Sequence, residues 1–232
     1  MKEIVGKTFS IADENEPVAG CTISKNIYSS GVGDVTVSGI DSNSNTLEIT
    51  IFSMAKNTDI SSETYRTNKF IMVHAGSVEV CSNTHTSHKV CAGESYLALA
   101  SNEVGFKTQT GAVYTEITFE RNSIMNESIK AGEVFTLAEK LPYAEGKIVN
   151  MDVVRNDKMK FALMAFDAGE GLSEHAASGE ALIFALDGEG EIGYEGKTHS
   201  IKAGENFHFA KGGKHWVRAK TKFKMALLLT LE

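Results

Sequence analysis

The two halves of this 232-residue chain repeat one another. "GKTFSIADENEP" near the start matches "GEVFTLAEKLP" in the middle, "AGSVEV" matches "DGEGEI", "AGESYLALA" matches "AGENFHFAK", and "EITFE" matches "LLTLE". The second match aligns Gly76 with Gly188. Four short matches in the same order predict two copies of one structural unit, at 1–122 and 127–232.

Both copies have the pattern of β-strands. Stretches such as "DVTVSGI", "LEITIF", "AVYTEITFE", "ALIFAL" and "FKMALLLTLE" are rich in β-branched and aromatic residues, and clusters of Gly, Asn, Asp and Ser separate them. Helical patterns are confined to short pieces near "SIADENE" and "TLAEKL". The sequence therefore predicts an all-β fold of the sandwich or barrel kind, with few short helices.

Charge and hydropathy narrow the class of protein. The formal net charge is −7, whereas a general nucleic-acid binder is usually basic, so we expect no nucleic-acid partner. No run of 18 apolar residues occurs, and the first residues lack the apolar core of a signal peptide. We therefore expect no membrane partner and a cytoplasmic location.

The second copy has strands marked by glycines, and its last motif ends in a Gly-x-x-His step. "GENFHFAKGGKHWVRA" contains Gly204, Gly212 and His215, and His175 lies 13 residues before Gly188. In both spacings the chain resembles the cupins, small β-barrels of the double-sheet jelly-roll type. The resemblance covers most of the second copy and extends to the first through the repeat. It implies two tandem jelly-roll barrels, a bicupin arrangement.

The resemblance also implies a metal site, of which this sequence keeps two positions. His175 and His215 stand at cupin histidine positions, but Ala177 and Ala181 replace a second histidine and a glutamate. The complete set would suit Fe, Mn, Ni, Cu or Zn. Two imidazoles alone seldom hold a divalent metal firmly. Glu180 is the candidate third ligand, provided that a bulge at the preceding glycine turns it into the barrel; on a regular strand it points away.

Three functions are open for the second copy, and the residues do not decide whether the chain is an enzyme. The leading hypothesis is a pocket for a small molecule around His175 and His215. Four neighbours in the sequence would line it as well: Phe207, His208, Phe209 and Trp216. One alternative is a metal-dependent dioxygenase or isomerase that uses the two histidines and Glu180. Another is a structural protein that forms homodimers through apolar strand faces.

Basic residues in "KGGKHWVRA" suggest one property of the ligand. Lys211, Lys214 and Arg218 would form a positive rim near the pocket, in an otherwise acidic protein. Such a rim attracts anionic small molecules. The alternative interpretation rests on the alternating lysines that follow, Lys220, Lys222 and Lys224, which would line a solvated strand face without a ligand.

The first copy has fewer candidate ligands. Under the repeat, Glu63, Tyr65 and Val104 stand at the positions of His175, Ala177 and His215. We therefore expect the first barrel to be structural, or an emptied pocket that supports the second one.

The cysteines and two further histidines of the first copy suggest little more. Cys81 and Cys91 flank a predicted hairpin loop that contains His85 and His88. These four residues could form a metal site at the surface. The commoner arrangement is that such cysteines are small side chains packed in strands.

Overall fold

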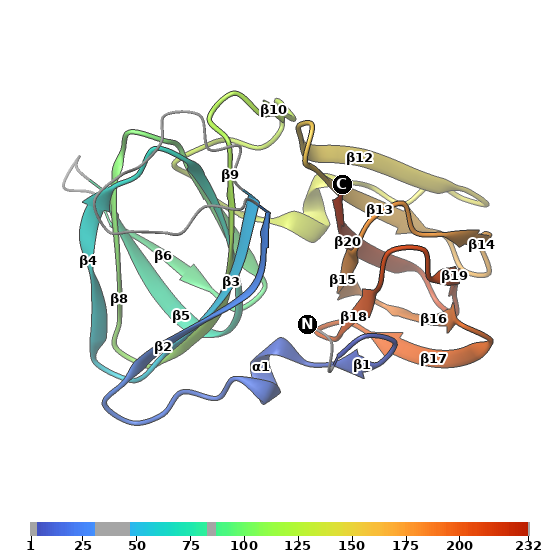
Figure 1. Cartoon of the computed structure of the whole chain (residues 1–232), viewed down its shortest axis with the longest axis horizontal. Coiled ribbons are helices and arrows are strands. Elements are labelled where there is room, and N and C mark those ends of the chain that lie inside the picture. Colours follow the sequence, from blue (N-terminus) through green and yellow to red (C-terminus); the bar gives the residue numbers. More distant parts are fainter. Residues whose placement is uncertain (1–3, 31–46, 83–86, 232) are drawn as a thin grey trace. The chain divides into compact units, whose positions relative to one another are not determined.

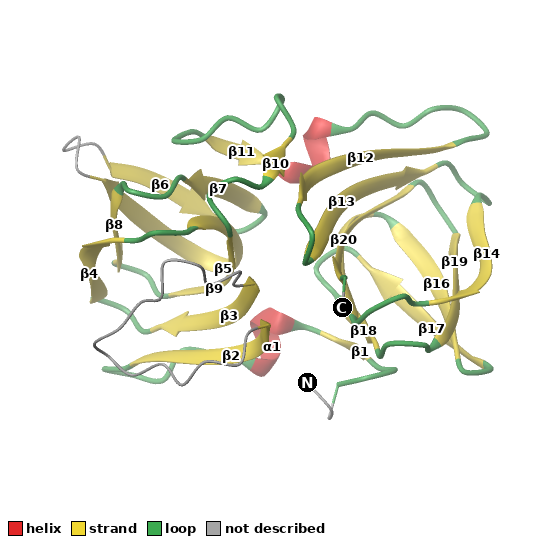
Figure 2. Ribbon diagram, turned by 45° about the horizontal axis from the view of Figure 1, so that its top comes forward, coloured by secondary structure: helices red, strands yellow, loops and turns green. Residues whose placement is uncertain are grey.

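The computed structural model of the protein describes residues 4–30, 47–82 and 87–231. Strands dominate these residues, and their helical elements are α1 (Ile11–Glu14) and the 3-10 helix η1 (Leu137–Lys140) (Figure 2). The prediction of an all-β fold with short helices is confirmed. The predicted strand "DVTVSGI" and the loop with His85 lie outside the described residues. No described helix is both long enough and apolar enough to cross a membrane.

The chain divides into two compact units. We call the first the C-terminal unit, which consists of residues 1–14, 124–129 and 136–232. The second is the N-terminal unit, which consists of residues 15–123 and 130–135. The boundaries expected for the two copies of the repeat, 1–122 and 127–232, stay a prediction.

The C-terminal unit is a barrel of two antiparallel sheets that curl toward each other (Figure 1). The larger sheet has the order β1 (Thr8–Phe9), β18 (Asn206–Phe209), β15 (Ala181–Asp187), β20 (Phe223–Thr230), β13 (Met159–Phe166), β12 (Ile148–Arg155) and β10 (Ile124–Met125). The smaller sheet has the order β14 (Gly171–Ala176), β19 (Lys214–Ala219), β16 (Glu189–Tyr194) and β17 (Lys197–Lys202). Alternate residues of these strands, among them Ile183, Phe207 and Val217, face each other and form the core.

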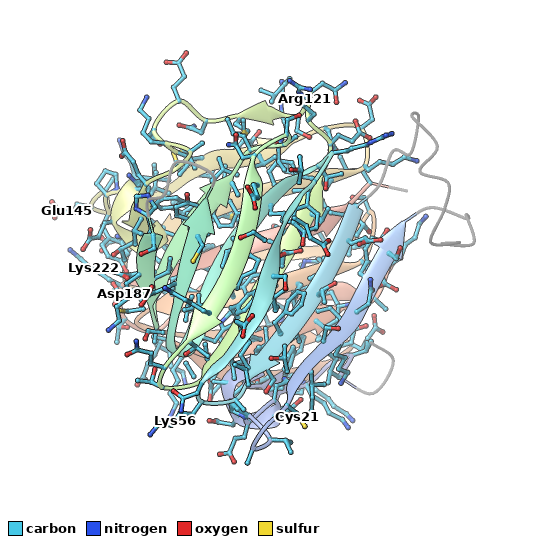
Figure 3. All side chains as sticks on the ribbon, turned by 90° about the vertical axis from the view of Figure 1, so that its left-hand side faces the viewer. Cys21, Lys56, Arg121, Glu145, Asp187 and Lys222 are labelled. Carbon is cyan, nitrogen blue, oxygen red and sulfur yellow. The ribbon has the colours of Figure 1, made fainter. Side chains whose placement is uncertain are left out.

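The N-terminal unit repeats this plan. Its larger sheet has the order β11 (Val134–Thr136), β7 (Glu94–Ala98), β5 (Asn68–Ser82), β9 (Ala112–Phe119), β3 (Leu47–Met54) and β2 (Thr22–Ser30). In the second sheet, β8 (Glu103–Thr108) pairs with β4 (Thr58–Thr64) and with the end of β5, which also pairs with β6 (Ser87–Cys91). Figure 3 shows Cys21 and Lys56 near one end of this unit and Arg121 near the other.

A glycine marks the same corner in each unit. At Gly76 the long strand β5 passes from one sheet to the other, and Gly188 lies between β15 and β16. Both have positive φ, +68° and +73°. A Cβ at Gly76 would lie 2.0 Å from the Gly111 carbonyl oxygen, and one at Gly188 would lie 1.8 Å from that of Lys222. Both corners therefore need a residue without a side chain, which explains why these glycines match in the sequence.

Candidate functional site

The site begins with two histidines that the strand register places side by side. β14 pairs with β19 so that His175 lies opposite His215, and the centroids of the two rings are 4.2 Å apart. The register shifts between Leu172 and His175, so a bulge precedes the pair. Val217, two residues after His215, belongs to the barrel core. Both imidazoles therefore lie on the face of the sheet that carries the core, where His215 is buried and His175, on the edge strand β14, is exposed.

Backbone hydrogen bonds fix the tautomer of both rings. Nδ1 of His175 is 2.8 Å from the carbonyl oxygen of Ser173, and Nδ1 of His215 is 3.1 Å from that of Gly213. A carbonyl oxygen can only accept, so each Nδ1 carries the proton and donates it. In the neutral rings both Nε2 atoms then have a free lone pair, which can accept a hydrogen bond or bind a metal ion.

Burial keeps His215 neutral. Its exposed fraction is 7%. Desolvation lowers the pKa of His215 below the ordinary value, the hydrogen bond with the Gly213 carbonyl opposes this, and the charge of His175 lowers it further. At neutral pH His215 is therefore a hydrogen-bond acceptor.

A cluster of aromatic rings packs against His215. The Phe209 ring stacks on His215 with centroids 4.0 Å apart, and Phe207 lies 5.0 Å from Phe209. Tyr194 lies opposite His215 in β16, with its ring 5.5 Å from that of Phe209. Tyr194 is not among the residues predicted from the sequence, although its alternation with the buried Ile192 could have placed it on the interior face.

The two alanines at the remaining motif positions also belong to this interior. Ala177 and Ala181 are 7% and 3% exposed and are part of the barrel core. Their side chains have no atom that could bind a metal ion. Within the ranges 4–30, 47–82 and 87–231, no three His, Cys, Asp or Glu side chains are grouped so that they could hold a metal ion. The residues present therefore do not fit a firmly bound metal.

Glu180 and His208 lie on the other face of the larger sheet. Their neighbours Ala181 and Phe209 point into the core, while His208 pairs with Leu182. Oε2 of Glu180 is 3.4 Å from Nε2 of His208, and burial lowers the pKa of His208. The preceding residue, Gly179, lies where a Cβ would be 1.9 Å from the Thr230 carbonyl oxygen. This glycine therefore permits the close approach of the end of β20. The structure does not bring Glu180 to the histidine pair.

Trp216 also faces away from the histidine pair. A Cβ on Gly193 would lie 1.9 Å from its Nε1, so the indole covers that glycine on the outer face of the smaller sheet. There it borders an open hollow of about 440 Å³ together with Glu174, Glu191 and Arg218. Of the six pocket residues predicted, the structure thus gathers His175, Phe207, Phe209 and His215, and places His208 and Trp216 elsewhere.

Comparison with known proteins identifies this architecture. Residues 162–231 match the family model described as "Cupin domain". The solved structure of a Cupin 2 conserved barrel domain protein from Leptotrichia buccalis is similar over 97% of both chains, with 26% identity and a TM-score of 0.79. The protein is a member of the cupin superfamily.

Other similar structures share the fold alone. A mutant of salicylate 1,2-dioxygenase from Pseudoaminobacter salicylatoxidans matches 79% of this cupin and 70% of its own chain, with 11% identity and a TM-score of 0.59. Protein Ylba from E. coli matches over 79% and 76%, with 10% identity and a TM-score of 0.53. The search of curated proteins finds no match.

The cupin motif positions recur at equivalent places in the N-terminal unit. Glu63 pairs with Val104 across β4 and β8, after a register shift like the one before His175. The Tyr65 carbonyl accepts a hydrogen bond from Ser101 N, as the Ala177 carbonyl does from Gly212 N.

The fourth motif position of that unit is Lys69. It pairs with Ala98, as Ala181 pairs with Phe209 in the C-terminal unit. This lysine is not among the motif residues predicted from the sequence.

Proposed function

We propose that the C-terminal barrel of this cupin is a binding module for a small molecule that donates hydrogen bonds. The observation that carries the proposal is the pair of Nε2 atoms on His175 and His215, both left as acceptors by the hydrogen bonds at Nδ1. Phe209 supplies an apolar wall beside them. A hydroxylated aromatic molecule fits this combination of acceptors and ring surface.

The charge state of the site favours a ligand that donates hydrogen bonds over an anionic ligand. A neutral imidazole accepts a hydrogen bond, whereas an anionic ligand would require His215 to be protonated against its lowered pKa. The competing prediction is an anionic ligand attracted by a basic rim of Lys211, Lys214 and Arg218, although Arg218 borders the hollow on the outer face of the smaller sheet with Trp216. The two predictions differ in their dependence on pH.

Calorimetric titration with catechol tests the proposal, with 1,2-dimethoxybenzene as a matched compound that has no O–H donor. We expect catechol to bind and the dimethoxy compound to bind at least about tenfold more weakly. Catechol affinity should fall as the pH is lowered from 7 to 5, because a protonated imidazole no longer accepts. Equal binding of both compounds, or tighter binding at acid pH, would contradict the proposal.

Histidine variants locate the site. His175→Ala and His215→Ala should each weaken catechol binding about tenfold, since each removes one acceptor. The matched control is His199→Gln, in β17 of the same unit, whose ring lies 5.2 Å from Phe207. If the control weakens binding as much as the two site variants, the assignment of the pocket is wrong.

The metal-dependent alternative has its own test. A dioxygenase or isomerase that uses His175, His215 and Glu180 would retain about one equivalent of a divalent ion when purified without chelator. We expect less than one equivalent of metal, because the described residues bring only two possible metal ligands together. Elemental analysis after exposure to Fe, Mn, Ni, Cu and Zn salts decides between the two functions. The structural alternative predicts a homodimer, which light scattering would detect.

A further inference from the structure

A buried ion pair lies inside the N-terminal barrel. The ammonium of Lys69 in β5 donates to the carboxylate of Glu116 in β9, and their exposed fractions are 7% and 5%. Both side chains are on the interior face, because Ile71 and Tyr114, each two residues away on its strand, belong to the barrel core. Thr118 Oγ1 is 3.3 Å from the same carboxylate. Lys69 occupies the motif position at which cupins have a glutamate.

Two tyrosines complete this polar cluster, which we define as Lys69, Glu116, Tyr65 and Tyr114. Nζ of Lys69 lies 3.8 Å from the centroid of the Tyr65 ring. Tyr65 is only partly buried, so it is the member of the cluster that reaches solvent. Burial and the charges of Glu63 and Glu116 raise its pKa, so its hydroxyl stays protonated at neutral pH.

The Tyr114 hydroxyl is the unusual group of the cluster. Its ring is stacked between Phe52 and Phe106, with centroid distances of 4.9 and 5.3 Å, and the residue is 0% exposed. Among the described residues the hydroxyl has no hydrogen-bond partner. Burial and the nearby carboxylate of Glu116 raise the pKa of Tyr114, so the hydroxyl retains its proton and can donate.

An unpartnered buried hydroxyl destabilises a fold, because it has lost water without gaining another bond. Phenylalanine would preserve the stack of three rings and remove the penalty. A tyrosine at this position is therefore explained by a hydrogen bond that its hydroxyl forms only when a ligand is bound. Such a trade of stability for function is typical of binding sites.

We propose that the polar cluster of the N-terminal barrel is a second ligand site, for a small neutral molecule with a carbonyl oxygen on an apolar body. The oxygen accepts from Tyr114 and from an ammonium proton of Lys69 that does not engage Glu116. Phe52 and the neighbouring core residues contact the apolar part. The ligand is neutral because the lysine and the glutamate already balance each other, and a further buried charge would have no partner.

Benzamide and benzoate test the site, because they share a shape and differ in charge. In NMR titrations of the full chain at millimolar ligand, benzamide should shift resonances of the N-terminal barrel and benzoate should not. Tyr114→Phe should weaken benzamide at least about tenfold. Tyr96→Phe, which removes a hydroxyl elsewhere in the same core, should leave the affinity unchanged.

Thermal unfolding without ligand gives a readout that does not depend on the probe. Tyr114→Phe should raise the melting temperature, since it removes a polar group without a partner. A lower melting temperature would mean that the hydroxyl is already bonded, and it would overturn the proposal. The proposal also fails if benzamide does not bind, if benzoate binds as well, or if Tyr114→Phe binds benzamide like the wild type.

Discussion

The two units place their polar groups in different strands of equivalent barrels. In the C-terminal unit, the interior of the smaller sheet carries the pair His175–His215, while the same pair in the N-terminal unit is Glu63–Val104. The ion pair Lys69–Glu116 of the N-terminal unit instead joins β5 and β9 of the larger sheet.

The corresponding row of the C-terminal unit is apolar. Lys69 lies between Ala98 and Thr118 in its sheet, whereas Ala181 lies between Phe209 and Leu229. The bulky Phe209 thus occupies the position that the small Ala98 has in the N-terminal unit. One backbone plan can thus hold a polar interior on either sheet, provided that the facing row is filled by apolar side chains.

The largest expected effect comes from breaking the ion pair. Lys69→Met should lower the free energy of unfolding by about 3–5 kcal/mol, because it leaves the buried carboxylate of Glu116 without a partner. The double variant Lys69→Met/Glu116→Leu, which makes both positions apolar like their counterparts Ala181 and Leu227, should recover most of the loss. Urea unfolding measures both.

The exposed pair Lys107–Glu79 is the control for that comparison. Its two side chains are 51% and 29% exposed, so Lys107→Met should lower the free energy of unfolding far less than Lys69→Met does. Equal losses for Lys69→Met and Lys107→Met would show that burial does not matter at Lys69.

The two corner glycines should respond alike. Gly76→Ala and Gly188→Ala each add a Cβ against a carbonyl oxygen at positive φ, and each should cost about 3 kcal/mol in thermal unfolding. Gly196→Ala, at φ +77° with no neighbour within 4 Å of its Cβ, should cost about 1 kcal/mol. A large difference between Gly76 and Gly188 would break the equivalence of the corners.

Acidification should destabilise both units through their buried histidines. Burial lowers the pKa of His74 in the N-terminal unit to about 4 and also lowers those of His208 and His215. Between about pH 6.5 and the folded pKa, the unfolded chain binds more protons than the folded one, so stability falls as the pH falls. The loss is at most about 1.4 kcal/mol per pH unit and histidine.

Comparing urea midpoints at pH 7 and pH 5 checks this dependence. The variant His74→Gln should lose less stability on acidification than the wild type, because it lacks one of the depressed pKa values. If the variant and the wild type lose the same amount, His74 does not contribute to the acid sensitivity.

The smallest expected effect concerns the outer face of the C-terminal unit. Trp216→Phe and Glu180→Gln should each change catechol affinity by less than about twofold, because neither side chain is on the face of the histidine pair. A larger loss in the same calorimetric titration would return these residues to the site.

The amino-acid sequence by itself determined the fold class and the equivalence of the corners. Strand alternation and the glycine spacing follow from local backbone geometry, so Gly76 and Gly188 could be matched from letters alone. The sequence match placed the last strand of each copy one residue out of register. The letters "EITFE" and "LLTLE" align Thr118 with Thr230, but the strand pairs equate Thr118 with Leu229, one residue earlier.

Only the tertiary structure decided which side chains meet. The facing of Glu180 and His208 depends on a register that a single bulge can reverse, and sequence spacing does not report such bulges. The cluster of Lys69 and Glu116 joins residues 47 positions apart, whose pairing is set by the sheet. Local patterns therefore predicted the barrels and the histidine pair, while long-range strand pairing created the charged interior of the first barrel.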